Sequence, residues 1–145
     1  MRPPDLEQGE KLLREIASDR GRYWRDHGVL ALLGMVAVGG VLLAMGNPHA
    51  AIGALGAPLA IGARAAYLAS EQLGNRWWLT SQRLWLPGGR AVGLMEIATA
   101  RKLLGDVQII TRAGDKHLIR HIADPSALVA KIEAARDKRA KRGRR

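Results

Sequence analysis

Hydrophobic and charged residues are strongly segregated along this chain. No Asp, Glu, Lys or Arg occurs from Gly28 to Ala63, although charged residues make up 25% of the sequence. A gap of this length is far outside what random placement of the charges produces. The pattern therefore indicates a segment that is kept out of water.

The uncharged block has room for two membrane-spanning helices, each of which needs about 20 apolar residues. The first run covers about 28–46 and stops at the turn-forming residues Gly46-Asn47-Pro48-His49. The second covers about 50–69, where the stem of Arg64 can lie along the acyl chains while its guanidinium reaches the headgroups. The pattern predicts a helical hairpin with a very short outer loop.

The flanking residues agree with a membrane placement. Phe is absent, and all aromatic residues are Trp or Tyr, the types that favour the membrane–water interface. Arginines lie beside the two outer ends of the hairpin and are missing from the turn, which predicts that both termini are cytoplasmic. These residues are Tyr23, Trp24, Tyr67, Trp77 and Trp78, and Arg20, Arg22, Arg25, Arg64 and Arg76.

Three other interpretations of the block remain open. A signal peptide would have to be cleaved near Ala44-Met45-Gly46 after a leader that is long and contains acidic residues. A soluble buried hairpin gains weight from the many Gly and Ala residues and from Pro58. The third is a single span followed by a re-entrant segment. We prefer the hairpin, and expect the small residues to serve packing between its two helices.

After Gly74 the pattern becomes typical of short strands separated by turn residues. A hairpin turn is expected at Ala113-Gly114-Asp115. A helix is expected from Asp124 as N-cap and Pro125 as first residue, with an apolar stripe formed by Leu128, Val129, Ile132 and Ala135. The expected strands are Trp77–Thr80, Leu84–Leu86, a segment through Val92, Leu94 and Ile97, Ala98–Leu104, Val107–Arg112 and Leu118–Ile122.

Five segments of this half carry a resemblance to a known family: 75–84, 92–97, 104–107, 109–114 and 119–125. Taken in this order, they resemble the bacterial pleckstrin-homology-like (PH-like) domain of membrane-anchored proteins. The resemblance implies a seven-stranded, bent antiparallel sheet capped by a C-terminal helix, with paired membrane helices before it and no catalytic residues. Gly9-Glu10 followed by Leu12 resembles the opening segment of that family, whereas the compact turn Pro87-Gly88-Gly89-Arg90 departs from it, so no family-like binding loop is expected there.

The expected organisation has four parts. Residues 1–27 form an N-terminal cytoplasmic segment with an interfacial helix, and 28–70 form the two membrane helices. Residues 75–135 form the PH-like domain, and 136–145 form a basic tail with seven basic and one acidic residue, which holds most of the net charge of +10. The fold class is thus a membrane α-helical hairpin plus a small α+β domain.

Candidate chemistry is sparse. The absence of Cys excludes disulfides, thiolate metal sites and cysteine nucleophiles. His117 and His121 are expected on one strand face, but a metal needs a third ligand, for which Asp115 and Asp124 are only nominal candidates, so exposed histidines are the better interpretation. Gly88-Gly89-Arg90 lacks the lysine and the strand–helix context of a phosphate loop. We therefore expect no cofactor, no metal and no catalysis.

The working hypothesis is a non-catalytic protein of the bacterial inner membrane. It would present its PH-like domain at the cytoplasmic face to dock a protein partner or a membrane assembly. One alternative is direct binding of anionic lipid through the basic tail, a tail that equally well serves only solubility. A soluble nucleic-acid-binding protein is the third and least favoured reading. The candidate lipid or partner contacts are Arg64, Arg76, Trp77, Trp78, Arg136, Lys138, Arg139, Lys141 and Arg142.

Overall fold

The computed structural model describes residues 3–144 and consists of two compact units. The sheet unit comprises Met1–Asp19 and Gly74–Arg145, and the hairpin unit comprises Arg20–Leu73. Residues 1–2 of the expected N-terminal segment and Arg145 of the expected tail lie outside the described residues.

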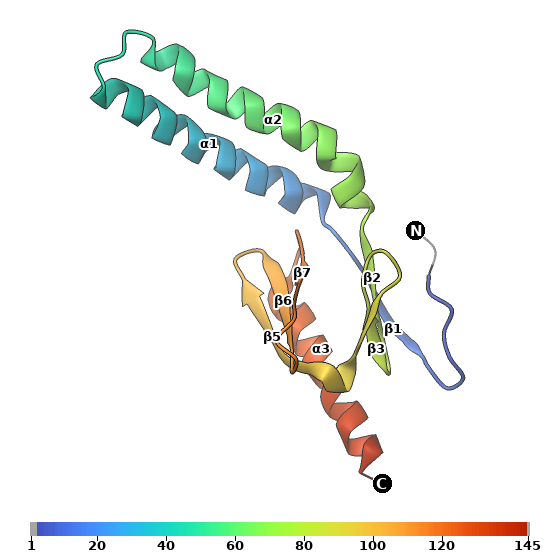
Figure 1. The fold of residues 1–145 in the computed structure, drawn as a ribbon. Coiled ribbons are helices and arrows are strands. Elements are labelled where there is room, and N and C mark those ends of the chain that lie inside the picture. The colour runs from blue at the N-terminus through green and yellow to red at the C-terminus, as the bar shows by residue number, and fades with distance from the viewer. Residues whose placement is uncertain (1–2, 145) are drawn as a thin grey trace. The chain divides into compact units, whose positions relative to one another are not determined.

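The hairpin unit contains two antiparallel helices, α1 (Arg20–Ala44) and α2 (Ala50–Gly74), joined by a short loop (Figure 1). Both are long and apolar enough to cross a membrane. They extend beyond the expected apolar runs into the charged flanks, and the added first turns of α1 contain an ion pair between Arg22 and Asp26 at 3.2 Å. In the loop, Gly46 has a positive φ of 66°, as the turn residues predict.

Small residues and one tyrosine hold the two helices together. A Cβ added at Gly39 would lie 3.0 Å from the Cβ of Ala54, so glycine allows the close approach at this point. The hydroxyl of Tyr23 donates a 2.7 Å hydrogen bond to the carbonyl oxygen of Ala65. The Tyr23 side chain is fully buried, so it packs between the helices.

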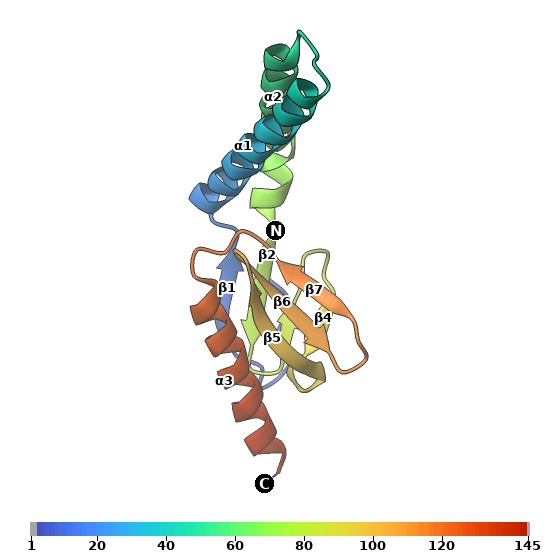
Figure 2. The same cartoon turned by 90° about the vertical axis from the view of Figure 1, so that its left-hand side faces the viewer.

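The sheet unit is built from two antiparallel sheets and a helix (Figure 2). The first sheet has the order β1-β2-β3-β4 and the second the order β5-β6-β7. A short 3-10 helix, η1, joins them. The bounds are β1 (Leu12–Ala17), β2 (Arg76–Thr80), β3 (Arg83–Trp85), β4 (Ala91–Gly93), η1 (Leu94–Glu96), β5 (Ile97–Leu103), β6 (Asp106–Thr111) and β7 (Lys116–Ile119).

The N-terminal segment differs from the expectation of a separate element with an interfacial helix. Residues 12–17 form strand β1, which pairs with β2 and places Ile16 in the core. Within the described residues 3–27, helical structure begins at Arg20, where it is the start of α1. The N-terminal segment therefore supplies an edge strand to the sheet unit.

The segment through Val92, Leu94 and Ile97 is not one strand. It divides into β4, η1 and β5, because the carboxylate of Glu96 accepts a 3.2 Å hydrogen bond from the Gly93 N–H and so closes a tight turn. The Leu94 N–H donates to the Gln82 carbonyl at 2.9 Å. This turn carries the chain from the first sheet to the second.

The β6–β7 hairpin forms at the expected turn, where Gly114 has a φ of 93°. Its second strand ends earlier than expected, at Ile119 rather than Ile122. The reason is His121, whose φ is 55° and whose N–H donates a 2.8 Å hydrogen bond to the carboxylate of Asp106. This left-handed residue turns the chain away from the sheet.

Helix α3 (Pro125–Gly143) begins as expected, with the Asp124 carboxylate accepting a 3.0 Å hydrogen bond from the Ala127 N–H. Its stripe of Leu128, Ile132 and Ala135 is buried against the sheets. The expected separate tail is wrong for most of its length, since α3 continues through residues 136–143 as one helix.

Candidate interaction surfaces

The most strongly charged surface of the sheet unit is the C-terminal part of α3. We call it the basic end of α3, and it consists of Arg136, Lys138, Arg139, Lys141, Arg142 and Arg144. Asp137 is the one acidic residue among 136–144. Cations in the last turn of a helix are favoured by the partial negative charge of its free carbonyl groups. The expected contacts on residues 136–142 are thus brought together on one helix.

The basic end is attached to the second sheet by Arg136. Its Nη1 donates a 3.0 Å hydrogen bond to the carbonyl oxygen of Ala98 in β5, and its Nε donates to the carboxylate of Asp137 at 3.3 Å. Lys138, Arg139, Lys141 and Arg142 are exposed. Arg136 therefore serves mainly to position the helix, while the following cations face solvent.

A hollow of about 420 Å³ lies beside the basic end. It is lined by Arg139, Arg142, Arg144 and the short residues Ala140 and Gly143, and on its other side by Met95 of η1. Met95 is 44% exposed and supplies an apolar surface next to the guanidinium groups. The hollow combines an apolar surface with several guanidinium groups.

Trp77 and Trp78 are not available as lipid or partner contacts, contrary to expectation. Their exposed fractions are 3% and 4%. Both lie in the inner strand β2, which has β1 and β3 as its neighbouring strands. Trp77 belongs to the hydrophobic core of the sheet unit. The adjacent aromatic pair that resembles an interface anchor in the sequence is part of the interior.

Arg64 and Arg76 have different environments. Arg76, at the start of β2, forms a 3.5 Å ion pair with Glu15 of the neighbouring strand and donates to the carbonyl oxygen of Asn75 at 3.0 Å. Arg64 is exposed on α2. Arg64 belongs to the hairpin unit, whereas Arg76 and the basic end of α3 belong to the sheet unit.

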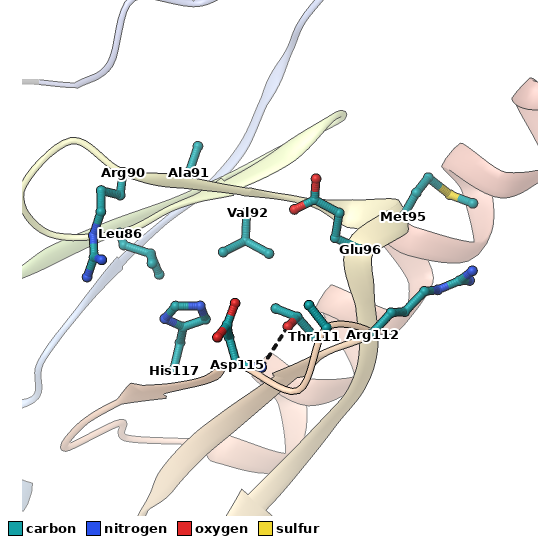
Figure 3. Close-up of a pocket in the computed structure, with 11 residues that line it drawn as sticks. Leu86, Arg90, Ala91, Val92, Met95, Glu96, Thr111, Arg112, Asp115 and His117 are labelled. Atoms are coloured by element: carbon teal, nitrogen blue, oxygen red, sulfur yellow. Dashed lines mark hydrogen bonds between the residues drawn. The ribbon is translucent and has the colours of Figure 1, made fainter.

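A second hollow, of about 550 Å³, lies between the edge strands β4 and β7 (Figure 3). Its floor is apolar, with Leu86 and Val92, and its rim carries both signs of charge, with Arg90 opposite Asp115 and His117. The two sheets are therefore open along this side, whereas α3 covers β5 at the other side. The mixed rim does not select a ligand of one charge.

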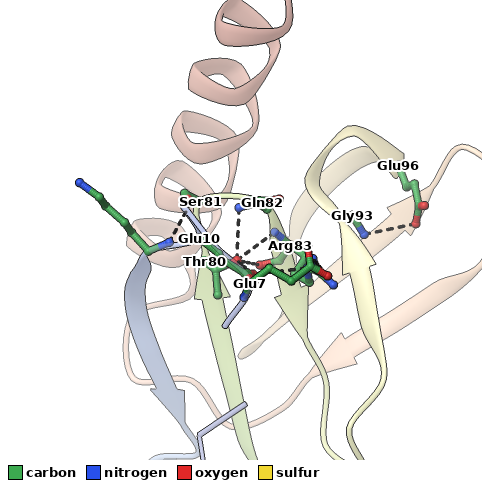
Figure 4. Close-up of polar contacts among 9 residues, drawn as sticks. Glu7, Glu10, Thr80, Ser81, Gln82, Arg83, Gly93 and Glu96 are labelled. Atoms are coloured by element: carbon green, nitrogen blue, oxygen red, sulfur yellow. Dashed lines mark hydrogen bonds and ion pairs between the residues drawn. The ribbon is translucent and has the colours of Figure 1, made fainter. Parts of the chain in front are cut away.

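A buried ionic cluster holds the N-terminal segment on the first sheet (Figure 4). The Glu10 carboxylate is fully buried and accepts a 2.5 Å hydrogen bond from the hydroxyl of Thr80 and a 3.1 Å hydrogen bond from the Glu7 N–H. Arg83 lies 3.3 Å from Glu10 and 2.6 Å from the exposed carboxylate of Glu7. The same guanidinium stacks over the ring of Trp85 at 5.5 Å.

The pKa of Glu10 reports the balance of forces in this cluster. Burial by itself raises the pKa, but the hydrogen bonds from Thr80 and the Glu7 N–H, the charge of Arg83 and the nearby Trp85 indole N–H together outweigh it. The resulting pKa lies below the ordinary value of 4.5, so Glu10 is ionised at neutral pH. All its partners are protein groups, and the cluster is explained as a structural clamp.

The two histidines do not share a strand face. His117 lies in β7 beside the hollow of Figure 3, whereas His121 follows the strand and is buried, which corrects the expectation of an exposed pair. Among the residues that the structure describes, no group of three or more His, Asp or Glu side chains is arranged to hold a metal ion.

Sequence reasoning missed Met95 and the open side between β4 and β7. The sequence signal for Met95 is weak, because a lone methionine between Leu94 and Glu96 is equally consistent with a buried strand residue. Its exposure follows from η1, which replaces the expected strand.

Comparisons with known proteins add no identification. The chain matches no protein-family model, no curated protein and no solved structure.

Proposed function

We propose that this is a non-catalytic, membrane-anchored protein of the bacterial inner membrane, in which the hairpin unit crosses the bilayer twice. The sheet unit is a PH-like domain that is presented at the cytoplasmic face to dock a protein partner or a membrane assembly. The termini are both cytoplasmic.

The exposed apolar surface of the hairpin unit carries this proposal. Only 6% of the most apolar 18-residue stretch of each helix is buried. The side chains of Leu43, Ile52 and Leu59 are 70–72% exposed. A soluble protein that used these helices as its core would bury them, and a fully exposed apolar surface of this size is stable only in contact with lipid or protein. This argues against the soluble nucleic-acid-binding alternative.

The PH-like assignment is supported by topology. The described residues contain seven antiparallel strands followed by a C-terminal helix, in agreement with the strand number and the helix that the resemblance implies. The strands form two sheets of four and three rather than the single bent sheet that was expected. The interruption of the first sheet by the two apolar helices, between β1 and β2, is compatible with a domain that is tethered at two points.

Alkaline carbonate extraction of cell membranes tests the anchor. The full chain should remain in the membrane pellet. A variant with residues 20–75 replaced by a short glycine-rich linker, called the hairpin-deleted variant below, should move to the supernatant. Release of the full chain at high pH would contradict the anchor, and retention of the hairpin-deleted variant would show that the sheet unit binds the membrane on its own.

A further inference from the structure

The basic end of α3 keeps like charges close together on an ordered helix. Lys138 and Arg142 are four residues apart, and Arg139 and Arg142 are three residues apart. Each such pair of like charges at neighbouring helical positions destabilises the helix. A helix that holds its cations in this way, and that is fastened to β5 through Arg136, is arranged to receive negative charge from outside the chain.

We propose that the basic end of α3, together with Met95, docks an acidic segment of a partner protein that carries an apolar side chain among its carboxylates. This inference rests on the proposed function and specifies the chemistry of the partner. Arginine guanidinium groups bind carboxylates with two parallel hydrogen bonds, so Arg139, Arg142 and Arg144 give both charge and geometry to the contact. The hollow of about 420 Å³ beside them receives the apolar side chain against Met95.

The position of the basic end within the sheet unit favours a protein segment over lipid. The chain leaves β1 at Ala17 and returns at Arg76, which are register partners, so both tethers start at the same end of the sheet unit. Helix α3 begins at that end, where the Asp19 N–H donates to the His121 carbonyl oxygen at 2.6 Å. The 19 residues of α3 then extend over about 28 Å away from this tether end of the sheet unit (Figure 2).

Within the sheet unit this separation is large compared with the range of electrostatic attraction. At physiological salt the Debye length is about 8 Å, so negative charge gathered at the tether end attracts the basic end only weakly. A protein segment can instead approach the basic end directly.

Peptide binding to the full chain in a neutral detergent tests the proposal. The probes are a fluorescein-labelled peptide of repeated Glu-Glu-Leu and a matched peptide of repeated Glu-Glu-Ser, measured by fluorescence anisotropy. The leucine-containing peptide should bind more tightly. The double variant Arg139→Gln with Arg142→Gln should weaken its binding by about tenfold or more. Met95→Gln should remove the preference for the leucine-containing peptide while leaving binding of the serine-containing peptide unchanged.

The control variant Arg101→Gln with Lys102→Gln removes the same charge from β5, where both residues are exposed. It should change binding by less than about twofold. Equal losses in the two double variants, or no effect of Met95→Gln, would overturn a built site in favour of unspecific attraction. Micelles doped with phosphatidylglycerol that compete with the peptide, where phosphatidylcholine does not, would overturn the choice of a protein segment in favour of lipid.

The outcome is separable from that of the anchor experiment. The double variant at Arg139 and Arg142 should still remain in the membrane pellet after carbonate extraction. If the peptide-binding test fails but the full chain stays in the membrane pellet, the proposed anchor remains intact. If the full chain binds the peptide but is released by carbonate, only the anchor is contradicted.

Discussion

Ala17, the last residue of β1, lies directly opposite Arg76, the first residue of β2, in the antiparallel register of the first sheet. The whole helical hairpin is therefore an insertion between two strands that would otherwise be joined by a tight turn. Two strand ends that are already neighbours need only a few residues to connect them. The sheet unit thus has the connectivity of an independent domain.

The hairpin-deleted variant is expected to fold and to be soluble without detergent. It retains all seven strands, α3 and the core from Ile16 to Ala135, and it also keeps the contacts of Ser18 and Asp19 with residues 120–121. Circular dichroism and a cooperative urea transition would report the native fold. A soluble but non-cooperative product would show that the sheet unit depends on the hairpin unit for stability.

Replacing Glu10 by Gln should destabilise the sheet unit by about 1–3 kcal/mol, because the half-buried Arg83 loses its buried counter-charge and Thr80 loses a charged acceptor. The matched change Glu7→Gln removes an exposed partner of the same arginine and should cost only about 0–1 kcal/mol. Urea unfolding of the hairpin-deleted variant measures both. Equal effects would contradict the central place of Glu10 in the clamp.

The stability of the sheet unit should also depend on pH through Glu10. Its pKa in the folded protein is lowered relative to the ordinary value of 4.5, so its contribution is fully present above that value and is lost as the pH falls through the folded pKa. The unfolding free energy should therefore decrease below about pH 4.5, and less steeply in Glu10→Gln. Parallel curves for the two proteins would assign the acid sensitivity to other carboxylates.

Within the hairpin unit, the hydroxyl of Tyr23 should stabilise the pairing of α1 and α2. Tyr23→Phe removes its buried hydrogen bond to Ala65 and should cost about 0.5–1.5 kcal/mol. Tyr67→Phe is a suitable control, since Tyr67 is 83% exposed on the same pair of helices. Unfolding of the full chain in mixed detergent micelles with increasing dodecyl sulfate compares the two, and a larger effect at Tyr67 would contradict the packing of Tyr23.

Much of the secondary structure follows from local patterns in the sequence. The charge-free block predicts the two helices, and Gly46 and Gly114 mark turns because they adopt positive φ. Asp124 and Pro125 predict the start of α3, and the stripe of Leu128 and Ile132 predicts its buried face. Each of these signals acts within a few residues, which is why a single sequence is sufficient to read it.

The errors arise where long-range contacts decide. Strand β1 carries charges and exposed leucines without clean alternation, and it is a strand because β2 supplies its hydrogen bonds from a distant part of the chain. Trp77 and Trp78 look like interface residues because they follow a long apolar helix, yet both are buried in β2, which pairs with β1 and β3. The basic end of α3 was expected as a solvated tail, but the bond from Arg136 to Ala98 ties its first residue to β5.

The most direct test of the central claim uses the absence of Cys from the chain, which allows single cysteines to be labelled without background. Asn47→Cys lies in the loop between α1 and α2, and Ser126→Cys lies on the exposed surface of α3 in the sheet unit. In intact spheroplasts, a membrane-impermeant maleimide should label Asn47→Cys, and it should label Ser126→Cys only after the membrane is disrupted. Labelling of Ser126→Cys in intact spheroplasts, with protection of Asn47→Cys, would contradict the proposed topology.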